Sequence, residues 1–435
     1  MTDPWKSNLP FVRVQTDVEI PDEPKVSGIM RVTTRGSAPP VALTQEFGIG
    51  IEVRGHSSQG VPKKQYSVEL RDQSGNDLPA ALLGLPLDSD WILQGPYIDK
   101  TLLRNALAYG LSNDIGRYAS RVKFIDLRLE RRWRWVSWDW LPDWLSDVRS
   151  WLRGTEVGTY SLLERIKRSP NRVDVQPVSD LDPSGGYIVR IDKGSDPYFT
   201  TTPKPPYSIN GTKILYFYPK GADVTPIQGT WIRDFFEAFE LSLASPSFTD
   251  PATGYTTYID VASFVDYLII NELFRNVDAF RISTYMHKDR GAKLVMGPVW
   301  DFDLSMGNAW PGGRDYRGWV IYDTVPATDS WQAPFWWKRL LEDPSFVAAL
   351  NTRWQVLRSS LVTSEALELR VKRIVTEICD SQFRNFQIWP ILGQFVWPNA
   401  PVRYTYPEEI GALVAWLRER TAWIDQHIAA PGPTA

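Results

Sequence analysis

Hydrophobic and polar residues alternate along the first part of the chain, as they do in β-strands with one buried face. The alternation is clear in FGIGIEVRG (47–55) and KQYSVELRD (64–72), which are separated by a short segment with Gly60 and Pro62. Glycine and proline favour turns, so the pattern predicts two strands joined by a turn. Residues 121–130 alternate in the same way and predict a further strand.

Apolar residues recur at helical spacing between these strands, in residues 99–116. Leucines occupy every fourth position from Leu103 to Leu111, which predicts a helix with one apolar face. Asp99 is the predicted N-cap of this helix and Gly116 the predicted C-cap.

Helical spacing dominates the chain beyond about residue 225, after strand-like runs at 157–166, 185–193 and 213–220. The periodicity predicts an α+β protein with a β-rich first half and a mainly helical second half. We expect four parts: a β-rich N-terminal extension at 1–44, a first lobe at 45–175, a second lobe at 176–428 and a disordered tail at 429–435.

A tryptophan-rich insertion at 131–154 interrupts the strand pattern of the first lobe. Pro142 suits the first turn of a helix, and Trp144, Val148 and Trp151 then form one apolar stripe. The stripe either packs on the main body or forms a separate binding surface. The twenty tryptophans of the whole chain likewise indicate either a Trp-rich core or an aromatic ligand surface.

The composition excludes several classes of protein. The net charge of −3 gives no electrostatic drive toward nucleic acid, and the single cysteine, Cys379, excludes an internal disulfide or a cysteine-based zinc site. We expect no transmembrane segment and no signal peptide, because no long apolar stretch and no basic-then-apolar start occur. Walker A, G-x-G-x-x-G, G-x-S-x-G and H-E-x-x-H motifs are also absent from the sequence. The compartment and the oligomeric state stay open.

Two acidic motifs remain as candidate chemistry. Asp278 follows an apolar helix, while Asp301 and Asp303 follow the apolar run KLVM in GPVWDFDLS. Asp301 lies 23 residues after Asp278, and the sequence between them predicts a hairpin, whose ends must lie together. Enzymes of phosphoryl transfer use two such acids: one orients the acceptor hydroxyl, and the other holds a metal on the phosphates. The alternative is that both acids only cap turns.

A basic turn in the first lobe is the candidate phosphate-binding element. Arg54, Ser58 and Lys64 lie in the strand-turn-strand segment VRGHSSQGVPKKQYSVEL. Backbone N–H groups in such a turn, together with a basic side chain, can bind phosphates. A basic β-turn without a ligand is the alternative.

Several segments together resemble the CotH family, the kinase-like proteins of the spore coat. They occur in matching order between about residues 45 and 428: RGHSSQGVPKKQYSVEL, WILQGPYIDKTLLRNALA, GTYSLLERIKRSPNRVDV, GGYIVRID, NELFRNVDAFRISTYMHKDRGAKLVMGPVWDFDLSMGN and FQIWPILGQFVWPN. The resemblance implies a divergent two-lobed protein-kinase-like fold. It also implies ATP-dependent phosphorylation of Ser and Thr residues of a protein substrate, with Mg²⁺ or Mn²⁺.

The resemblance assigns roles to individual residues. Asp278 matches the catalytic-loop aspartate and Asp301 the metal-binding aspartate. The nucleotide-binding candidates are Arg54, Ser58, Lys64 and Glu164. A kinase catalytic loop has Asn five residues after its Asp, whereas this chain has Ser283 there. The candidate metal site therefore comprises Asp301, Asp303 and Ser283, with Asn308 as a further possible replacement for the missing ligand.

Two other functions stay open at this point. A kinase fold can perform another transfer, adenylylation or glutamylation, and the departure at Ser283 keeps that alternative. The chain can also be a catalytically weak surface or assembly protein whose Trp-rich insertion binds a partner. The insertion at 131–154 is not a general feature of the family.

Overall fold

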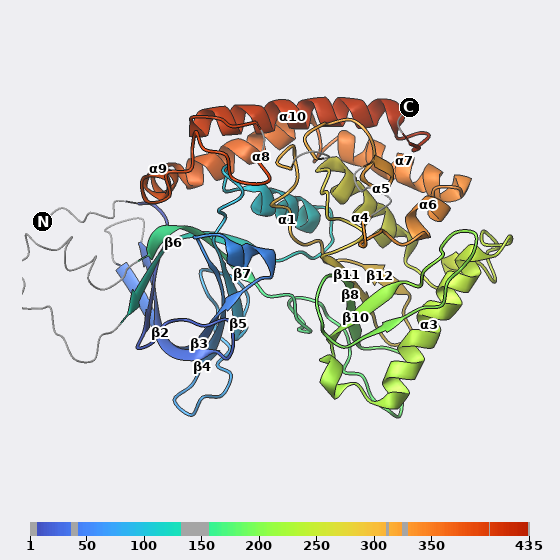
Figure 1. Ribbon diagram of the computed structural model, residues 1–435, viewed down its shortest axis with the longest axis horizontal. Helices are drawn as coiled ribbons and strands as arrows, with labels where there is room; N and C mark the ends of the chain where they lie inside the picture. Colours follow the sequence, from blue (N-terminus) through green and yellow to red (C-terminus); the bar gives the residue numbers. More distant parts are fainter. Residues whose placement is uncertain are drawn as a thin grey trace, which may run out of the picture.

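The computed structural model describes residues 7–35, 42–131, 156–309, 313–323, 329–399 and 401–433. Except for Arg131, the predicted Trp-rich insertion at 131–154 lies outside these residues, as do the last two residues of the predicted tail. The described chain forms a β-rich part at one end and a mainly helical part at the other (Figure 1). The predicted α+β class, with its β-rich first half and mainly helical second half, is confirmed.

The N-terminal part is a closed barrel with the strand order β1-β2-β3-β4-β5-β7-β6. The strands are β1 (Phe11–Thr16), β2 (Val26–Arg35), β3 (Ala42–Arg54), β4 (Gln65–Arg71), β5 (Asp90–Gln94), β6 (Val122–Arg131) and β7 (Glu156–Glu164). A parallel pairing between β1 and β6 closes the barrel. The predicted strands at 47–55, 64–72, 121–130 and 157–166 are confirmed as β3, β4, β6 and β7.

Strands β1 and β2 belong to this barrel rather than lying apart from it. Alternate residues of β1, such as Val12 and Val14, are buried inside with those of β3 and β6. The expected boundary between residues 44 and 45 lies within β3. The division into an extension, two lobes and a tail stays a prediction.

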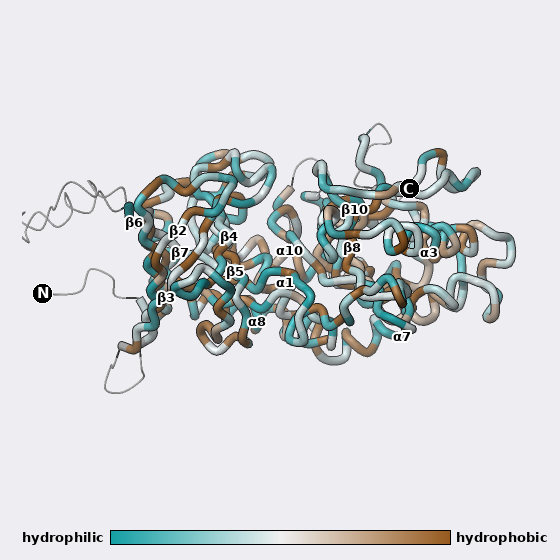
Figure 2. Tube along the Cα trace, turned by 90° about the horizontal axis from the view of Figure 1, so that it is seen from below, coloured by the Kyte–Doolittle hydropathy of each residue, from teal (hydrophilic) through white to brown (hydrophobic). Residues whose placement is uncertain are grey.

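Helix α1 (Arg104–Asp114) lies between the barrel and the helical part (Figures 1 and 2). The prediction of a helix over 99–116 with Asp99 as its N-cap is wrong at the first turn. Leu102 has φ +66°, which helical residues do not adopt, and Leu103 occupies the N-cap position. Asp99 instead accepts hydrogen bonds from the N–H groups of Thr101 (3.0 Å) and Arg104 (2.9 Å).

The C-terminal part contains a five-stranded antiparallel sheet with the order β12-β11-β8-β10-β9. Its strands are β8 (Tyr187–Ile191), β9 (Tyr198–Thr200), β10 (Lys213–Tyr218), β11 (Thr284–Lys288) and β12 (Leu294–Met296). The predicted strands at 185–193 and 213–220 are confirmed as β8 and β10, and the predicted hairpin as β11 and β12.

Eight described helices belong to this part: α3 (Pro226–Ala244), α4 (Val261–Leu273), α5 (Val320–Asp323), α6 (Trp336–Leu340), α7 (Pro344–Arg358), α8 (Ser364–Glu377), α9 (Cys379–Ile388) and α10 (Tyr406–His427). Helix α3 packs beside the sheet, and α10 runs along the opposite edge of the molecule (Figure 1). Buried residues of α1, the sheet, α3, α4, α7 and α10 share one hydrophobic core. None of the helices in the described ranges is both long and apolar enough to cross a membrane.

Several of the tryptophans belong to the core. Trp91 lies in the barrel, and Trp336, Trp337 and Trp354 lie in the helical part, each less than 2% exposed. The interpretation of a Trp-rich core therefore holds for these residues. Trp397, by contrast, is 71% exposed.

Candidate functional site

The catalytic-loop candidate begins where α4 ends, at a point fixed by a buried ion pair. Arg420 of α10 lies 3.1 Å from the carboxylate of Glu272 and also donates to the Glu272 carbonyl (2.9 Å). The same carboxylate accepts the N–H groups of Val320 and Ile321. Removing either partner of a buried ion pair is strongly destabilising. The contacts of Glu272 therefore fix the end of α4, from which the loop starts.

Asn276 brings the two acidic motifs together. Its side-chain amide donates to the carbonyl of Asp301 (3.0 Å), and its side-chain oxygen accepts the N–H of Asp278 (3.3 Å). Asn276 is buried, at 1% exposure, so these hydrogen bonds are protected from water. The structure thus places Asp278 and Asp301 on the same anchoring side chain.

The backbone around these acids adopts uncommon conformations. Phe280, Ser283 and Asp301 have φ values of +71°, +51° and +61°. Left-handed residues other than glycine are held only where the surroundings over-determine them, and they concentrate at functional sites. Phe280 is held by packing against Trp337, with ring centroids 4.6 Å apart.

Asp278 is a partly buried carboxylate with one direct cationic partner. Its side chain is 19% exposed, and Arg281 lies 2.8 Å from its Oδ1. Burial raises the pKa of Asp278, while the charges of Arg281 and Lys193 oppose that increase. A raised pKa makes a carboxylate a better proton acceptor near neutral pH.

Asp301 is surrounded by other acids. Burial raises its pKa to about 6, and the negative charges of Asp278 and Asp192 add to the effect. The N–H of Asp301 donates to the hydroxyl of Tyr109 on α1 (3.0 Å). Groups from α1 and from the loop after α4 therefore fix the backbone of Asp301, and the charge of Arg54 with the N–H of Asp303 offsets only part of the increase in its pKa.

Asp303 is clamped by α1. Asn105 donates to its Oδ1 (2.6 Å), and the side-chain oxygen of Asn105 accepts the N–H of Phe302 (2.7 Å). Burial raises the pKa of Asp303 well above its usual range, and the negative charges of Asp301 and Asp99 raise it further. The two acids of the DFD motif thus repel each other across Phe302.

The predicted replacement ligands have partners of their own. Asn308 donates to the carbonyl of Asp303 (2.7 Å), and its side-chain oxygen accepts a hydrogen bond from Asn399 (3.0 Å). Ser283 donates its N–H to Asp192 (3.3 Å). Asn308 thus supports the DFD segment through its side chain, and Ser283 borders the acids through its backbone.

Of the predicted nucleotide-binding residues, Arg54 reaches the acids. It lies at the end of β3, and its guanidinium is 5.4 Å from the centroid of the Trp300 ring. Burial lowers the pKa of Arg54, and the charge of Asp301 opposes that decrease. Arg54 is therefore a barrel residue whose charge acts on Asp301.

Ser58, Lys64 and Glu164 lie elsewhere. Ser58 is in the short 3₁₀ helix η1 (Ser57–Gly60), and Lys64 donates to the carbonyl of Gln59 (2.5 Å). Glu164 is fully buried and pairs with Arg121 at 2.8 Å. In the described part of the chain, none of the three makes a hydrogen bond or ion pair with the acidic motifs. Their nucleotide-binding roles stay predictions.

The acids suit a metal ion that a nucleotide helps to bind. Across the residues that the structure describes, no three His, Cys, Asp or Glu side chains are arranged to hold a metal by themselves. Mg²⁺ in nucleotide enzymes, however, usually takes one or two carboxylates together with phosphate oxygens and water. Asp301 and Asp303 supply two such carboxylates, and their mutual repulsion favours a bound cation.

Sequence reasoning missed four residues of this site: Asn105, Asp192, Lys193 and Asn276. Asp192 directly follows strand β8 in GGYIVRID, which is the same signal that singled out Asp301 after its strand. Asn105 and Asn276 carried no sequence signal, because an amide side chain becomes informative only when its partners are known.

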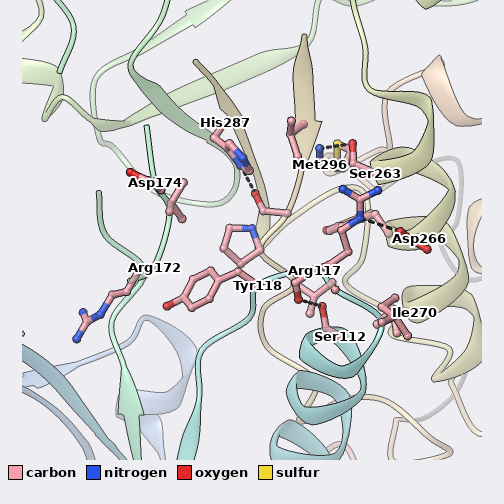
Figure 3. Close-up of a pocket in the computed structure, with 18 residues that line it drawn as sticks. Ser112, Arg117, Tyr118, Arg172, Asp174, Ser263, Asp266, Ile270, His287 and Met296 are labelled. Carbon is pink, nitrogen blue, oxygen red and sulfur yellow. Dashed lines mark hydrogen bonds and ion pairs between the residues drawn. The ribbon is translucent and has the colours of Figure 1, made fainter. Parts of the chain in front are cut away.

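A cavity of about 190 Å³ lies between α1, α4 and the β11–β12 hairpin (Figure 3). His287 lines it and lies 3.3 Å from the carbonyl of Gly297 through Nδ1, while Arg117 pairs with Asp266 at 2.7 Å. None of the predicted site residues lines this cavity. Tyr118 lines the cavity, and its hydroxyl donates to Glu164 (3.3 Å).

Without metal, the stability of the protein is expected to depend on the protonation of Asp301. The folded state holds a proton up to a pKa of about 6, whereas the unfolded chain releases it near its ordinary value of about 3.9. This contribution to stability is therefore present at low pH and is lost as the pH rises through about 6. Between about pH 4.5 and about pH 7, Asp301→Asn should gain about 2 kcal/mol in unfolding free energy relative to the wild type.

Urea denaturation in a chelator at the two pH values measures this difference. Asp234→Asn, on the exposed side of α3, is the matched control and should show no relative gain. Equal pH dependence in the wild type and in Asp301→Asn would contradict the expectation.

Two comparisons with known proteins complete the description of the site. The family model described as CotH kinase protein matches residues 51–424. The curated proteins contain no match to the chain.

Proposed function

The chain belongs to the CotH kinase protein family, and we propose that it is an ATP-dependent protein kinase that phosphorylates Ser or Thr residues of a protein acceptor with Mg²⁺ or Mn²⁺. The observation that supports this proposal most is the joint anchoring of Asp278 and Asp301 by Asn276. Phosphoryl transfer requires one acid at the acceptor hydroxyl and another at the metal-bound phosphates, and these two acids come from opposite ends of a hairpin.

Asp278 is the proposed proton acceptor. As the acceptor oxygen forms its bond to the γ-phosphorus, the bond from that phosphorus to the β–γ bridging oxygen breaks and ADP leaves. The proton of the acceptor hydroxyl passes to Asp278, whose pKa is raised by burial. Arg281, 2.8 Å away, holds the carboxylate in one orientation.

Asp301 and Asp303 are the proposed metal ligands. A divalent cation bound there supplies positive charge at the β- and γ-phosphates. Asn105 and Asn276 fix the two acids from α1 and from the catalytic loop. Arg54, which approaches from the barrel over Trp300, is the proposed phosphate contact of the first lobe.

A second transfer reaction has support at one position. Protein kinases place a metal-binding Asn five residues after the catalytic Asp, and here Ser283 occupies that position with its N–H bonded to Asp192. A different ligand set can bind the nucleotide in another orientation. Adenylylation is therefore the second candidate, and glutamylation is the third.

Labelled substrates distinguish these reactions. Purified protein is incubated with a casein-type acceptor and with itself, Mg²⁺ or Mn²⁺, and either γ-labelled ATP, α-labelled ATP, or unlabelled ATP with labelled glutamate. We expect protein-bound label from γ-labelled ATP alone, on Ser or Thr, and none from Asp278→Asn. Label from α-labelled ATP or from glutamate would overturn the proposal in favour of the corresponding transfer, and no label from any source would favour a binding protein.

A further inference from the structure

The end of β8 and the beginning of β11 bring a lysine beside the catalytic loop. Ile191, the last residue of β8, pairs with Thr284, the first residue of β11. The next residues, Asp192 and Lys193, therefore lie beside the end of the loop that contains Asp278. Asp192 joins the two segments, since its Oδ1 accepts the N–H groups of Lys193 (2.8 Å) and Ser283 (3.3 Å).

The turn that carries Lys193 is held from both sides. Arg190 bridges Asp192 (3.1 Å) and Asp196 (2.6 Å), and Lys213 donates to the carbonyl of Gly194 (3.1 Å). Gly194 has φ +120°, a conformation that favours glycine and reverses the chain at this point. The backbone of Lys193 is thus fixed before any ligand binds.

The arginine of the loop that carries Asp278 is already engaged, and Arg54 approaches the acids from the barrel side. Arg281 contacts Asp278 (2.8 Å), the Val277 carbonyl (3.1 Å) and Asp329 (3.6 Å). Lys193 is half-buried, and its ammonium makes no hydrogen bond or ion pair with the residues that the structure describes. Its charge nevertheless acts on Asp278. An anion placed beside this ammonium would gain a charge-assisted contact without breaking an ion pair among the described residues.

We propose that Lys193 contacts the γ-phosphoryl group of ATP and stabilises its charge during transfer, an inference that rests on the proposed kinase function. Negative charge on the transferring group requires a cation on its side of the site as well as the metal on the other. The loop from Asp278 to Ser283 contains no lysine, and its one arginine is held by Asp278 itself. The β8–β9 turn supplies the cation instead.

Binding of nucleotides with and without a γ-phosphate tests this contact. Affinities for a non-hydrolysable ATP analogue and for ADP, both with Mg²⁺, are measured by calorimetry for the wild type, Lys193→Met and Lys193→Gln. Lys220→Met is the matched control, because Lys220 is exposed beyond the far end of β10. We expect the Lys193 variants to bind the ATP analogue about tenfold more weakly while ADP affinity changes by less than about twofold. Turnover should fall by about tenfold or more, with partial recovery in Lys193→Arg.

Two outcomes would overturn the inference: equal loss of affinity for both nucleotides, which indicates a structural role, or no loss for either. Because the affinity ratio requires no acceptor, it is independent of the labelling experiment. If the wild type transfers no γ-label but the Lys193 variants lose affinity for the ATP analogue alone, the kinase reaction is refuted and the phosphate contact is retained. If the wild type transfers γ-label but the Lys193 variants show no selective loss of affinity for the ATP analogue, only the contact between Lys193 and the γ-phosphate is refuted.

Discussion

Asp278→Asn is expected to lower phosphoryl transfer by about 10²-fold or more while leaving the affinity for MgATP nearly unchanged. Asparagine keeps the size of the side chain and can accept a hydrogen bond from Arg281, but it cannot take the proton of the acceptor hydroxyl. The nucleotide contacts assigned to Arg54, Asp301 and Asp303 stay in place. Turnover on a verified acceptor and calorimetry with MgATP measure the two effects separately.

The pH dependence of the wild type provides a second readout of the same residue. Asp278 must be ionised to accept a proton, so turnover should fall as the pH decreases through its pKa. Burial raises that pKa, and the decline should therefore begin at a higher pH than for an ordinary aspartate. Asp234→Asn on the exposed surface of α3 is the control and should retain both turnover and pH profile. Near-wild-type turnover in Asp278→Asn would show that this loop does not provide the base.

Asp301→Asn is expected to abolish metal-dependent nucleotide binding. Loss of residues that merely support a metal ligand commonly weakens metal affinity by about 10- to 100-fold, so loss of a carboxylate ligand should cost more than about 10²-fold. Asparagine retains the backbone hydrogen bonds to Asn276 and Tyr109, because these involve the main chain of residue 301. The substitution therefore removes the charge and preserves the anchoring.

Calorimetry with ATP, with and without Mg²⁺, measures this effect. The wild type should bind ATP more tightly with the metal, whereas Asp301→Asn should bind with the same weak affinity in both conditions. Asp278→Asn serves as the matched control, since it also replaces one acid of the site but should keep the metal dependence. An unchanged response of Asp301→Asn to Mg²⁺ would exclude Asp301 from the metal site.

The two substitutions together separate the proposed roles of the acids. If Asp278 and Asp301 only capped turns, both variants would lose stability without a selective effect on turnover or metal dependence. The Asp301 carboxylate accepts the N–H of Asp303, but burial and the charges of Asp278 and Asp192 outweigh that contact and raise its pKa to about 6. Asp72, an exposed carboxylate that caps a turn without acids beside it, has a lowered pKa instead.

The basic turn shows how far a local sequence motif can be interpreted. Arg54 and Lys64 are close in sequence and were expected to line one phosphate loop. In the structure Arg54 extends over Trp300, whereas Lys64 turns to the Gln59 carbonyl. The neighbouring Lys63 is buried against Thr159 and Asn385 and joins the barrel to α9. Arg54, Lys63 and Lys64 have different roles, because their side chains leave the barrel in different directions and meet different partners.

Features that depend on local periodicity could be predicted from the sequence alone. Alternating positions and short apolar runs are both typical of strands, so β3, β4, β6, β7, β8 and β10 were predictable. The hairpin between Asp278 and Asp301 was predictable as well, and with it the closeness of its ends. The order of motifs along the chain also identified the family, because that order is a property of the sequence alone.

Features that join distant segments could be seen only in the folded chain. The parallel pairing of β1 with β6 closes the barrel, and no local pattern specifies which strands meet. Asn105 reaches Asp303 across 198 positions of the chain. Lys193 and Asp192 lie beside the catalytic loop only because β8 pairs with β11. Such contacts depend on packing between elements rather than on periodicity within them, and side chains from separate elements therefore became parts of one site only in the folded chain.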